Sequence, residues 1–137
     1  MYKKILCAID GSEHAQAAID EAVELAKKEG AKLTFVMVNV ATGGVRAPLT
    51  YRWDEPYVAE TLAKARATAE QAGLSGVEAV EIKSQDAAAA VVEYADENEV
   101  DHIVTGTGDR SLVSRLGLGS FARAVSAKAH CSVMVAR

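Results

Sequence analysis

The chain has 137 residues, of which 50% are hydrophobic and 25% are charged, and its formal net charge is −4. These values are typical of one soluble globular domain over residues 1–137, and the scattered lysines and arginines form no basic patch that would bind nucleic acid. No apolar run approaches the length of a membrane span, and the first four residues lead into only a short apolar stretch. We therefore expect a cytoplasmic protein without an export signal.

Short apolar runs alternate with helical patterns along the chain. The runs at residues 5–9, 33–40, 77–82, 101–105 and 132–136 predict strands, because they are too short for helices. A helix is expected from the N-cap Ser12 to a left-handed cap at Gly30, and further helices over 57–72, 86–98 and 121–128, the last capped by Ser120. This βαβαβαβαβ order predicts an α/β fold: a doubly wound, mostly parallel five-stranded sheet with helices on both faces.

Residues 42–56 break the alternation with two glycines, two prolines and a polar-aromatic stretch. Irregular segments of this length are uncommon in compact domains unless they bind something or move. We expect Tyr51 and Trp53 either to cover a pocket or to form a contact surface.

Cysteine and histidine usage argues against covalent or metal chemistry. Cys7 and Cys131 lie in or beside predicted strands, so we expect reduced packing residues rather than a disulfide. His14, His102 and His130 lack the spacing of metal ligands, so we expect solvent-facing or capping roles and no metal site. These positions support no arrangement of nucleophile and base, and no catalytic residues are assigned.

Two turns follow the first and fourth predicted strands. One is the tripeptide at residues 10–12, and the other is the glycine-rich segment at residues 106–120. In a doubly wound sheet such turns flank the point where the strand order reverses, which is where ligands bind. One turn would hold a base, and backbone N–H groups of the other would surround phosphates. The alternatives are a plain turn with a helix cap and a surface loop shaped by its glycines.

The glycine-rich segment matches neither the P-loop nor the dinucleotide fingerprint, which sets aside P-loop ATPases and NAD enzymes. Together with residues 3–12 and 130–137, however, it closely resembles the universal stress protein family, and the resemblance spans essentially the whole chain. Family members with ATP carry a glycine, two residues, a glycine, nine residues, and then Gly-Ser or Gly-Thr. Here Gly106, Gly119 and Ser120 agree with that pattern, and Asp109 stands at the second glycine.

Asp109 is the one departure from the pattern. A carboxylate that faces a triphosphate repels it unless Mg²⁺ lies between them. Gly108 could supply the close backbone approach instead, and Arg110 and Arg115 could offset the added charge. The sequence leaves open whether Asp109 prevents ATP binding.

The resemblance also implies which residues contact the ligand. Ala8, Ile9 and Asp10 would line the adenine side, and Val40 would meet the base through its backbone. The residues implied around the ribose and phosphates are Gly106, Gly108, Asp109, Gly119, Ser120 and Phe121. The implied ligand is ATP, or AMP or another adenine nucleotide, with or without Mg²⁺.

The last predicted strand carries an expectation about partners. Val133 and Val135 alternate there with Ser132, Met134 and Ala136, a pattern typical of an edge strand. An uncovered edge tends to pair with another chain. The resemblance implies a homodimer through Val133, Met134 and Val135, and the alternative is a monomer whose own helix covers the edge.

We expect a dimeric adenine-nucleotide sensor or regulator of the stress response that is not an enzyme, with slow ATP hydrolysis left open. The alternative is a dimeric protein-interaction module on the same fold, with a pocket impaired by Asp109.

Overall fold

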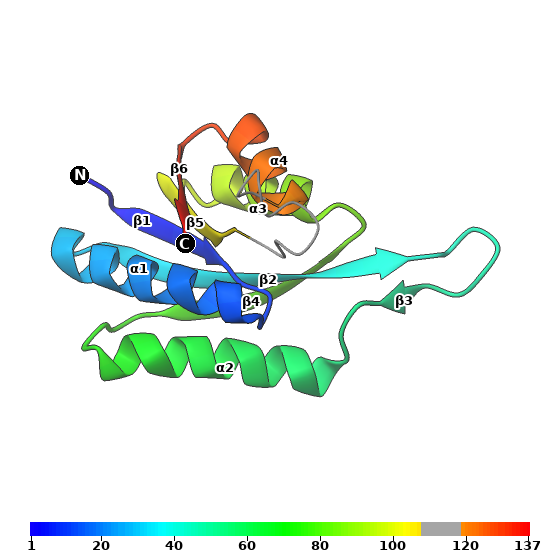
Figure 1. Cartoon of the computed structure of the whole chain (residues 1–137), viewed down its shortest axis with the longest axis horizontal. Helices are drawn as coiled ribbons and strands as arrows, with labels where there is room; N and C mark the ends of the chain where they lie inside the picture. The colour runs from blue at the N-terminus through cyan, green and yellow to red at the C-terminus, as the bar shows by residue number, and fades with distance from the viewer. Residues whose placement is uncertain (108–118) are drawn as a thin grey trace.

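The computed structural model describes residues 1–107 and 119–137. Within these ranges the elements follow one another as β1 (Lys4–Ala8), α1 (Glu13–Glu29), β2 (Lys32–Thr42), β3 (Thr50–Tyr51), α2 (Glu55–Gln71), β4 (Glu78–Ser84), α3 (Ala87–Glu97), β5 (His102–Gly106), α4 (Ser120–Lys128) and β6 (Ser132–Ala136) (Figure 1). The α/β class and the alternation of elements are confirmed. Five of these strands were predicted, and β3 was not.

The five predicted strands run parallel in the order β4-β2-β1-β5-β6, and β3 pairs antiparallel with the end of β2. The chain leaves β1 toward β2 on one side, and β5 later adds on its other side, so the strand order reverses at β1. The two turns that the sequence singled out therefore follow neighbouring strands at the same edge of the sheet.

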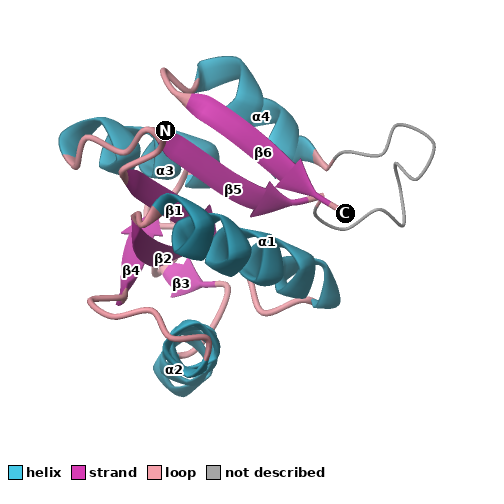
Figure 2. Cartoon of the chain, turned by 90° about the vertical axis from the view of Figure 1, so that its left-hand side faces the viewer, coloured by secondary structure: helices cyan, strands magenta, loops and turns pink. Residues whose placement is uncertain are grey.

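Helices cover both faces of the sheet, as Figure 2 shows. On β2, Phe35 and Met37 belong to the cluster beneath α1 and α2, whereas Val36 and Val38 belong to the cluster on the side of α3 and α4. Successive side chains of a strand point to opposite faces, so a strand that is covered on both faces is mostly apolar along its length. This burial explains why residues 35–38 of β2 are apolar without interruption. None of the described helices is long and apolar enough to cross a membrane.

The segment at residues 42–56 is more regular than predicted. β2 continues to Thr42, and β3 pairs Thr50 with Thr42 and Tyr51 with Ala41. The resulting hairpin projects beyond the body of the molecule in Figure 1. A two-residue strand is too short to show any alternation, which is why the sequence pattern did not predict it.

Two helix starts differ from the prediction. α2 begins at Glu55 rather than at residue 57, because Asp54 caps it by accepting a hydrogen bond from the backbone N–H of Tyr57 at 2.9 Å. Pro56 fits within the first turn, where its missing N–H costs nothing. The N-cap of α4 is Gly119, so the prediction that Ser120 caps this helix was wrong.

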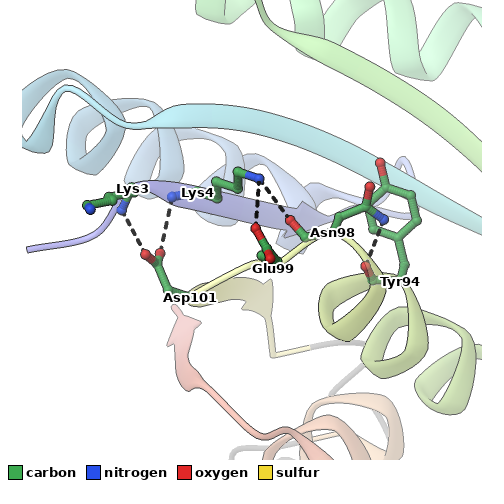
Figure 3. Close-up of polar contacts among 6 residues, drawn as sticks. All are labelled: Lys3, Lys4, Tyr94, Asn98, Glu99 and Asp101. Atoms are coloured by element: carbon green, nitrogen blue, oxygen red, sulfur yellow. Dashed lines mark hydrogen bonds and ion pairs between the residues drawn. The ribbon is translucent and has the colours of Figure 1, made fainter.

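Polar contacts tie the central strands together at their amino ends (Figure 3). The Asp101 carboxylate accepts hydrogen bonds from the backbone N–H groups of Lys3 at 2.9 Å and Lys4 at 3.2 Å. The Lys4 ammonium donates to the carbonyl of Asn98 at 3.3 Å and lies 3.8 Å from the Glu99 carboxylate. These contacts join the turn before β5 to β1 and so support the register of the two strands that carry the site.

His102 is buried, so the prediction of a solvent-facing or capping role was wrong. Only 4% of the residue is exposed, and its ring stacks on Tyr2 with 4.1 Å between centroids. Neither ring nitrogen has a hydrogen-bond partner among the described residues. Burial lowers the pKa of His102, and the charge of Asp101 opposes that shift.

Candidate functional site

A cavity of about 260 Å³ lies at the carboxyl edge of the sheet. Its walls come from β1, β2 and β5, from the first turns of α1, α3 and α4, and from the segment between β3 and α2. Seven of the ten residues predicted to contact a nucleotide line this cavity: Ala8, Ile9, Asp10, Val40, Gly106, Ser120 and Phe121. Gly119 directly precedes Ser120, and Gly108 and Asp109 lie outside the described residues.

The turn after β1 is held by its own polar groups. Oδ1 of Asp10 accepts hydrogen bonds from the backbone N–H of Ser12 at 2.9 Å and from its hydroxyl at 2.6 Å. Ser12 is the N-cap of α1, as predicted, but its side chain makes no capping hydrogen bond. A carboxylate has about four acceptor positions, so Asp10 retains the capacity to accept an N–H or O–H group of a ligand.

Gly11, in the middle of this turn, has a φ of 80°, a conformation that favours glycine. The hydroxyl of Tyr57, at the start of α2, occupies the space that a side chain on residue 11 would need. On this side of the turn a second cavity, of about 220 Å³, lies between α1 and α2 and shares Ile9, Ser12 and Ala15 with the first. The turn is therefore packed from α2 as well as from β1.

Three helices begin at the larger cavity. Ser12 and His14 of α1, Ala87 of α3, and Ser120 of α4 all contribute to its lining. The first N–H groups of a helix have no partner within the helix, and the helix dipole adds a partial positive charge there. The N-termini of α1 and α4, which follow β1 and β5, make that end of the cavity suited to an anion such as a phosphate.

The ends of the glycine-rich segment meet beside the cavity. The backbone N–H of Gly119 donates to the carbonyl of Thr107 at 2.7 Å, and Thr107 is buried. At the end of β5, Gly106 touches the backbone of the first turn of α1. These contacts fix where the segment leaves β5 and where it enters α4.

The opposite end of the cavity is apolar. Val36, Val38 and Val40 line it from one face of β2, and Ala8 adds to it from β1. The carbonyl of Val40, the predicted backbone contact for the base, accepts a hydrogen bond from the N–H of Arg52 at 3.0 Å. A carbonyl oxygen has two lone pairs, so this bond leaves one for a ligand.

Several lining residues were not predicted from the sequence. Val36 and Val38 could have been found, because side chains two and four positions before Val40 share its face. His14 and Arg52 carried no such signal. Trp53, for which a pocket cover was one of two expectations, does line the cavity.

Charged and metal-binding groups are few at this site. The described lining includes one carboxylate, Asp10, one guanidinium, Arg52, and one imidazole, His14. No group of three or more His, Cys, Asp or Glu side chains in the described ranges could hold a metal ion.

The residues predicted at a dimer interface lie elsewhere, on β6. Val133, Met134 and Val135 are half-buried on the strand at one edge of the parallel sheet. Among the described strands, β6 pairs with β5 alone. Its outer edge is thus in a position to pair with another chain.

Comparisons with known proteins agree on one family. The universal stress protein family matches residues 1–137. A universal stress protein of Staphylococcus haemolyticus is 34% identical over 147 residues, covering 99% of this chain and 85% of that protein. The universal stress protein from Archaeoglobus fulgidus, whose structure is a complex with dAMP, is 26% identical to this chain. The two structures have a TM-score of 0.75, and the match covers 99% of this chain and 98% of that one.

A further universal stress protein, whose structure is a complex with cAMP, is 24% identical with a TM-score of 0.80 and coverage of 99% and 97%. That likeness supports the fold. The match over the whole length and the 34% identity to a curated relative settle the classification. The chain belongs to the universal stress protein family.

Proposed function

We propose that this protein binds an adenine nucleotide at the carboxyl edge of its sheet and acts as a cytoplasmic, dimeric sensor or regulator of the stress response without being an enzyme. The observation that carries the proposal is the cavity, which is apolar against β2 and is lined at the ends of β1 and β5 by the N-termini of α1 and α4. An adenylate has the same division, with a flat base at one end and phosphate at the other. The dAMP bound by the Archaeoglobus relative supports this ligand class.

ATP is the nucleotide that the family pattern favours, and Asp109 is the residue that opposes it. Repulsion between a carboxylate and phosphate grows with the number of phosphates, so Asp109 should disfavour ATP more than AMP. Mg²⁺ bound to ATP would reduce that difference.

A thermal-unfolding experiment tests the proposal. A ligand that binds only the folded state stabilises it by about 2.7 kcal/mol at a concentration one hundred times its Kd. The melting temperature should rise with AMP, dAMP and Mg-ATP and should rise much less with GMP. An unchanged melting temperature at millimolar concentrations of all adenine nucleotides would contradict the proposal and favour the interaction module.

The variant Asp109→Gly separates the role of that residue from binding as a whole. If its carboxylate weakens binding, the variant should bind ATP more tightly and AMP about as before. An ATP affinity that is unchanged or weaker would show that Asp109 is not the obstacle. Phosphate release from ATP no faster than in buffer alone would exclude slow hydrolysis.

The interaction module has an observation of its own in its favour. The hairpin between β2 and β3 exposes Val45 to 94% and Leu49 to 49%, so both apolar side chains are accessible to a partner protein. The two functions differ in their response to nucleotide, so the thermal experiment distinguishes them.

A charged variant at the edge of β6 tests dimerisation through this strand. A charge introduced by Val133→Glu would have to be buried if this strand pairs with a second chain, which is costly. Sedimentation equilibrium should then give a dimer for the natural protein and a monomer for the variant. The same association state for both would rule out this interface.

A further inference from the structure

A buried amide on β2 organises one wall of the cavity. Asn39 is 1% exposed. Its Oδ1 accepts a hydrogen bond from the backbone N–H of Trp53 at 3.0 Å, and its Nδ2 donates to the carbonyl of Trp53 at 2.9 Å and to Oε2 of Glu81 at 3.0 Å. A buried amide is costly unless its polar atoms form hydrogen bonds. Here the N–H and the carbonyl of Trp53 bond to the two polar atoms of the Asn39 amide. Asn39 thus fastens Trp53 to β2 as a neighbouring strand would.

Arg52 is held beside this attachment. Its backbone N–H donates to the carbonyl of Val40 at 3.0 Å, and its guanidinium carbon lies 4.6 Å from the centroid of the Trp53 ring. That distance is within the range of a cation–π interaction. An exposed arginine side chain normally samples many rotamers, and the indole gives this one a preferred position next to the cavity that both residues line.

Arg52 and Trp53 stand at the apolar end of the cavity. Because the strand order is β2-β1-β5, the ends of β2 and β5 lie on opposite sides of β1. The helix N-terminus at Ser120 follows β5, whereas Arg52 is bonded to the last part of β2. A nucleotide with its phosphate at the N-terminus of α4 would have its base between Val40 and Arg52.

We propose that the guanidinium plane of Arg52 stacks on the base of the bound nucleotide, and that Trp53 and Asn39 are positioning residues that hold Arg52 there. This inference rests on the nucleotide-binding function proposed above. Guanidinium planes stack on nucleobases, and the aliphatic side chains of β2 offer a surface for the other face of the ring. Stacking leaves the edge of the base free for the backbone of Val40 and the carboxylate of Asp10.

Titration calorimetry with adenosine and AMP tests the role of Arg52. A contact with the base is present in both ligands, so Arg52→Ala should weaken both by the same factor, about tenfold for the loss of one stacking interaction. Arg52→Lys should not restore affinity, because lysine keeps the charge but lacks the plane. Arg46→Ala is the matched control, since Arg46 is an exposed arginine of the same hairpin outside the cavity lining, and it should leave both affinities unchanged.

Fluorescence tests the positioning residues, because Trp53 is the only tryptophan of the chain. Asn39→Asp keeps the acceptor for the Trp53 N–H but loses the donor to its carbonyl and places a second carboxylate beside Glu81. We expect the emission to shift to longer wavelength and the adenosine affinity to fall as in Arg52→Ala. In the Arg52→Ala background, Asn39→Asp should cost no further affinity. Trp53→Leu, at a half-buried position, should reproduce the loss if Asn39→Asp fails to fold.

The outcomes separate the two proposals. If the natural protein binds none of adenosine, AMP and Mg-ATP, the nucleotide-binding function and the stacking role are both overturned. If it binds adenosine and AMP and Arg52→Ala changes neither affinity, only the stacking role is overturned. A loss confined to AMP, restored by Arg52→Lys, would also overturn it, because Arg52 would then act on the phosphate by charge.

Discussion

Gly106 and His14 meet through their backbones. A β carbon on Gly106 would lie 2.6 Å from the carbonyl oxygen of His14 and 3.1 Å from its carbonyl carbon. The backbone of α1 cannot move aside as a flexible side chain could, so the end of β5 and the first turn of α1 are fixed at this separation. Both residues line the cavity, and the width of the cavity depends on their contact.

Gly106→Ala should therefore both destabilise the fold and weaken nucleotide binding. Forcing a methyl group into a packed contact typically costs about 1–3 kcal/mol, which urea unfolding measures. Gly30→Ala is the control: Gly30 has a φ of 64° with open space around it, so alanine there should cost about 1 kcal/mol through backbone strain without changing affinity. If Gly106→Ala keeps the unfolding free energy and the nucleotide affinity of the natural protein, the contact does not constrain the site.

The sequence predicted the parts of the fold that repeat with a fixed period. Strands that are covered on both faces contain consecutive apolar residues, as in residues 5–8 and 35–38, and the alternation of strands with helices implied a parallel sheet. The parts that it missed depend on single contacts. The cap at Asp54 and the short pairing of β3 leave no periodic signal, and the burial of His102 depends on Tyr2, which lies one hundred positions away along the chain.

A second prediction concerns the pH dependence of stability. Because burial lowers the pKa of His102 from its ordinary value of 6.5, the folded protein binds this proton more weakly than the unfolded chain does. Acidification below about pH 6.5 therefore favours the unfolded chain, and the loss of stability levels off below the lowered pKa of the folded state.

Urea unfolding of the natural protein and of His102→Phe between pH 7.5 and pH 5 measures this effect. Phenylalanine keeps a ring against Tyr2 and cannot titrate, so the free energy of unfolding should fall less on acidification in the variant. Parallel pH profiles for the two proteins would mean that His102 does not contribute.

Thiol reactivity provides a third prediction. Cys7 is fully buried, and burial raises the pKa of its thiol well above the usual range. The thiolate is the reactive form, so in a Cys131→Ser variant Cys7 should react with a disulfide reagent only when the core opens, at least about a thousandfold more slowly than in urea.

The variant Cys7→Ala reports on Cys131 alone. This thiol is half-buried, and its pKa is raised first by burial and then by the charges of Asp96 and Asp101. We expect it to react in the folded protein, slowly near neutral pH and faster as the pH rises. In the Cys131→Ser variant, by contrast, rapid labelling of Cys7 in native buffer would contradict the packing of β1.

The sequence predicted the candidate site only in part, and the division has a physical reason. Residues at strand ends, such as Asp10 and Gly106, follow from the rule that parallel strands present their carboxyl ends at one edge. The pairing of Asn39 with Trp53 depends instead on how the chain returns across β2 after the hairpin. No local pattern encodes that return, because the two residues are 14 positions apart in the chain and an irregular turn lies between them.

The last prediction concerns Asp54, the N-cap of α2, which directly follows Trp53. Asp54 Oδ1 accepts the backbone N–H of Tyr57 at 2.9 Å, and a carboxylate also interacts favourably with the helix dipole there. Asp54→Ala should lower the free energy of unfolding by about 1 kcal/mol, whereas Asp54→Asn keeps an acceptor and should lose only a fraction of this. Asp86→Ala gives a matched comparison at α3, where Oδ1 of Asp86 accepts a hydrogen bond from the N–H of Ala89 at 3.0 Å.

Because Asn39 holds Trp53 independently of the cap, Asp54→Ala should leave the emission of Trp53 unchanged in the folded state. A red shift as large as that of Asn39→Asp would instead show that the helix start, and not the amide, fixes this wall of the cavity.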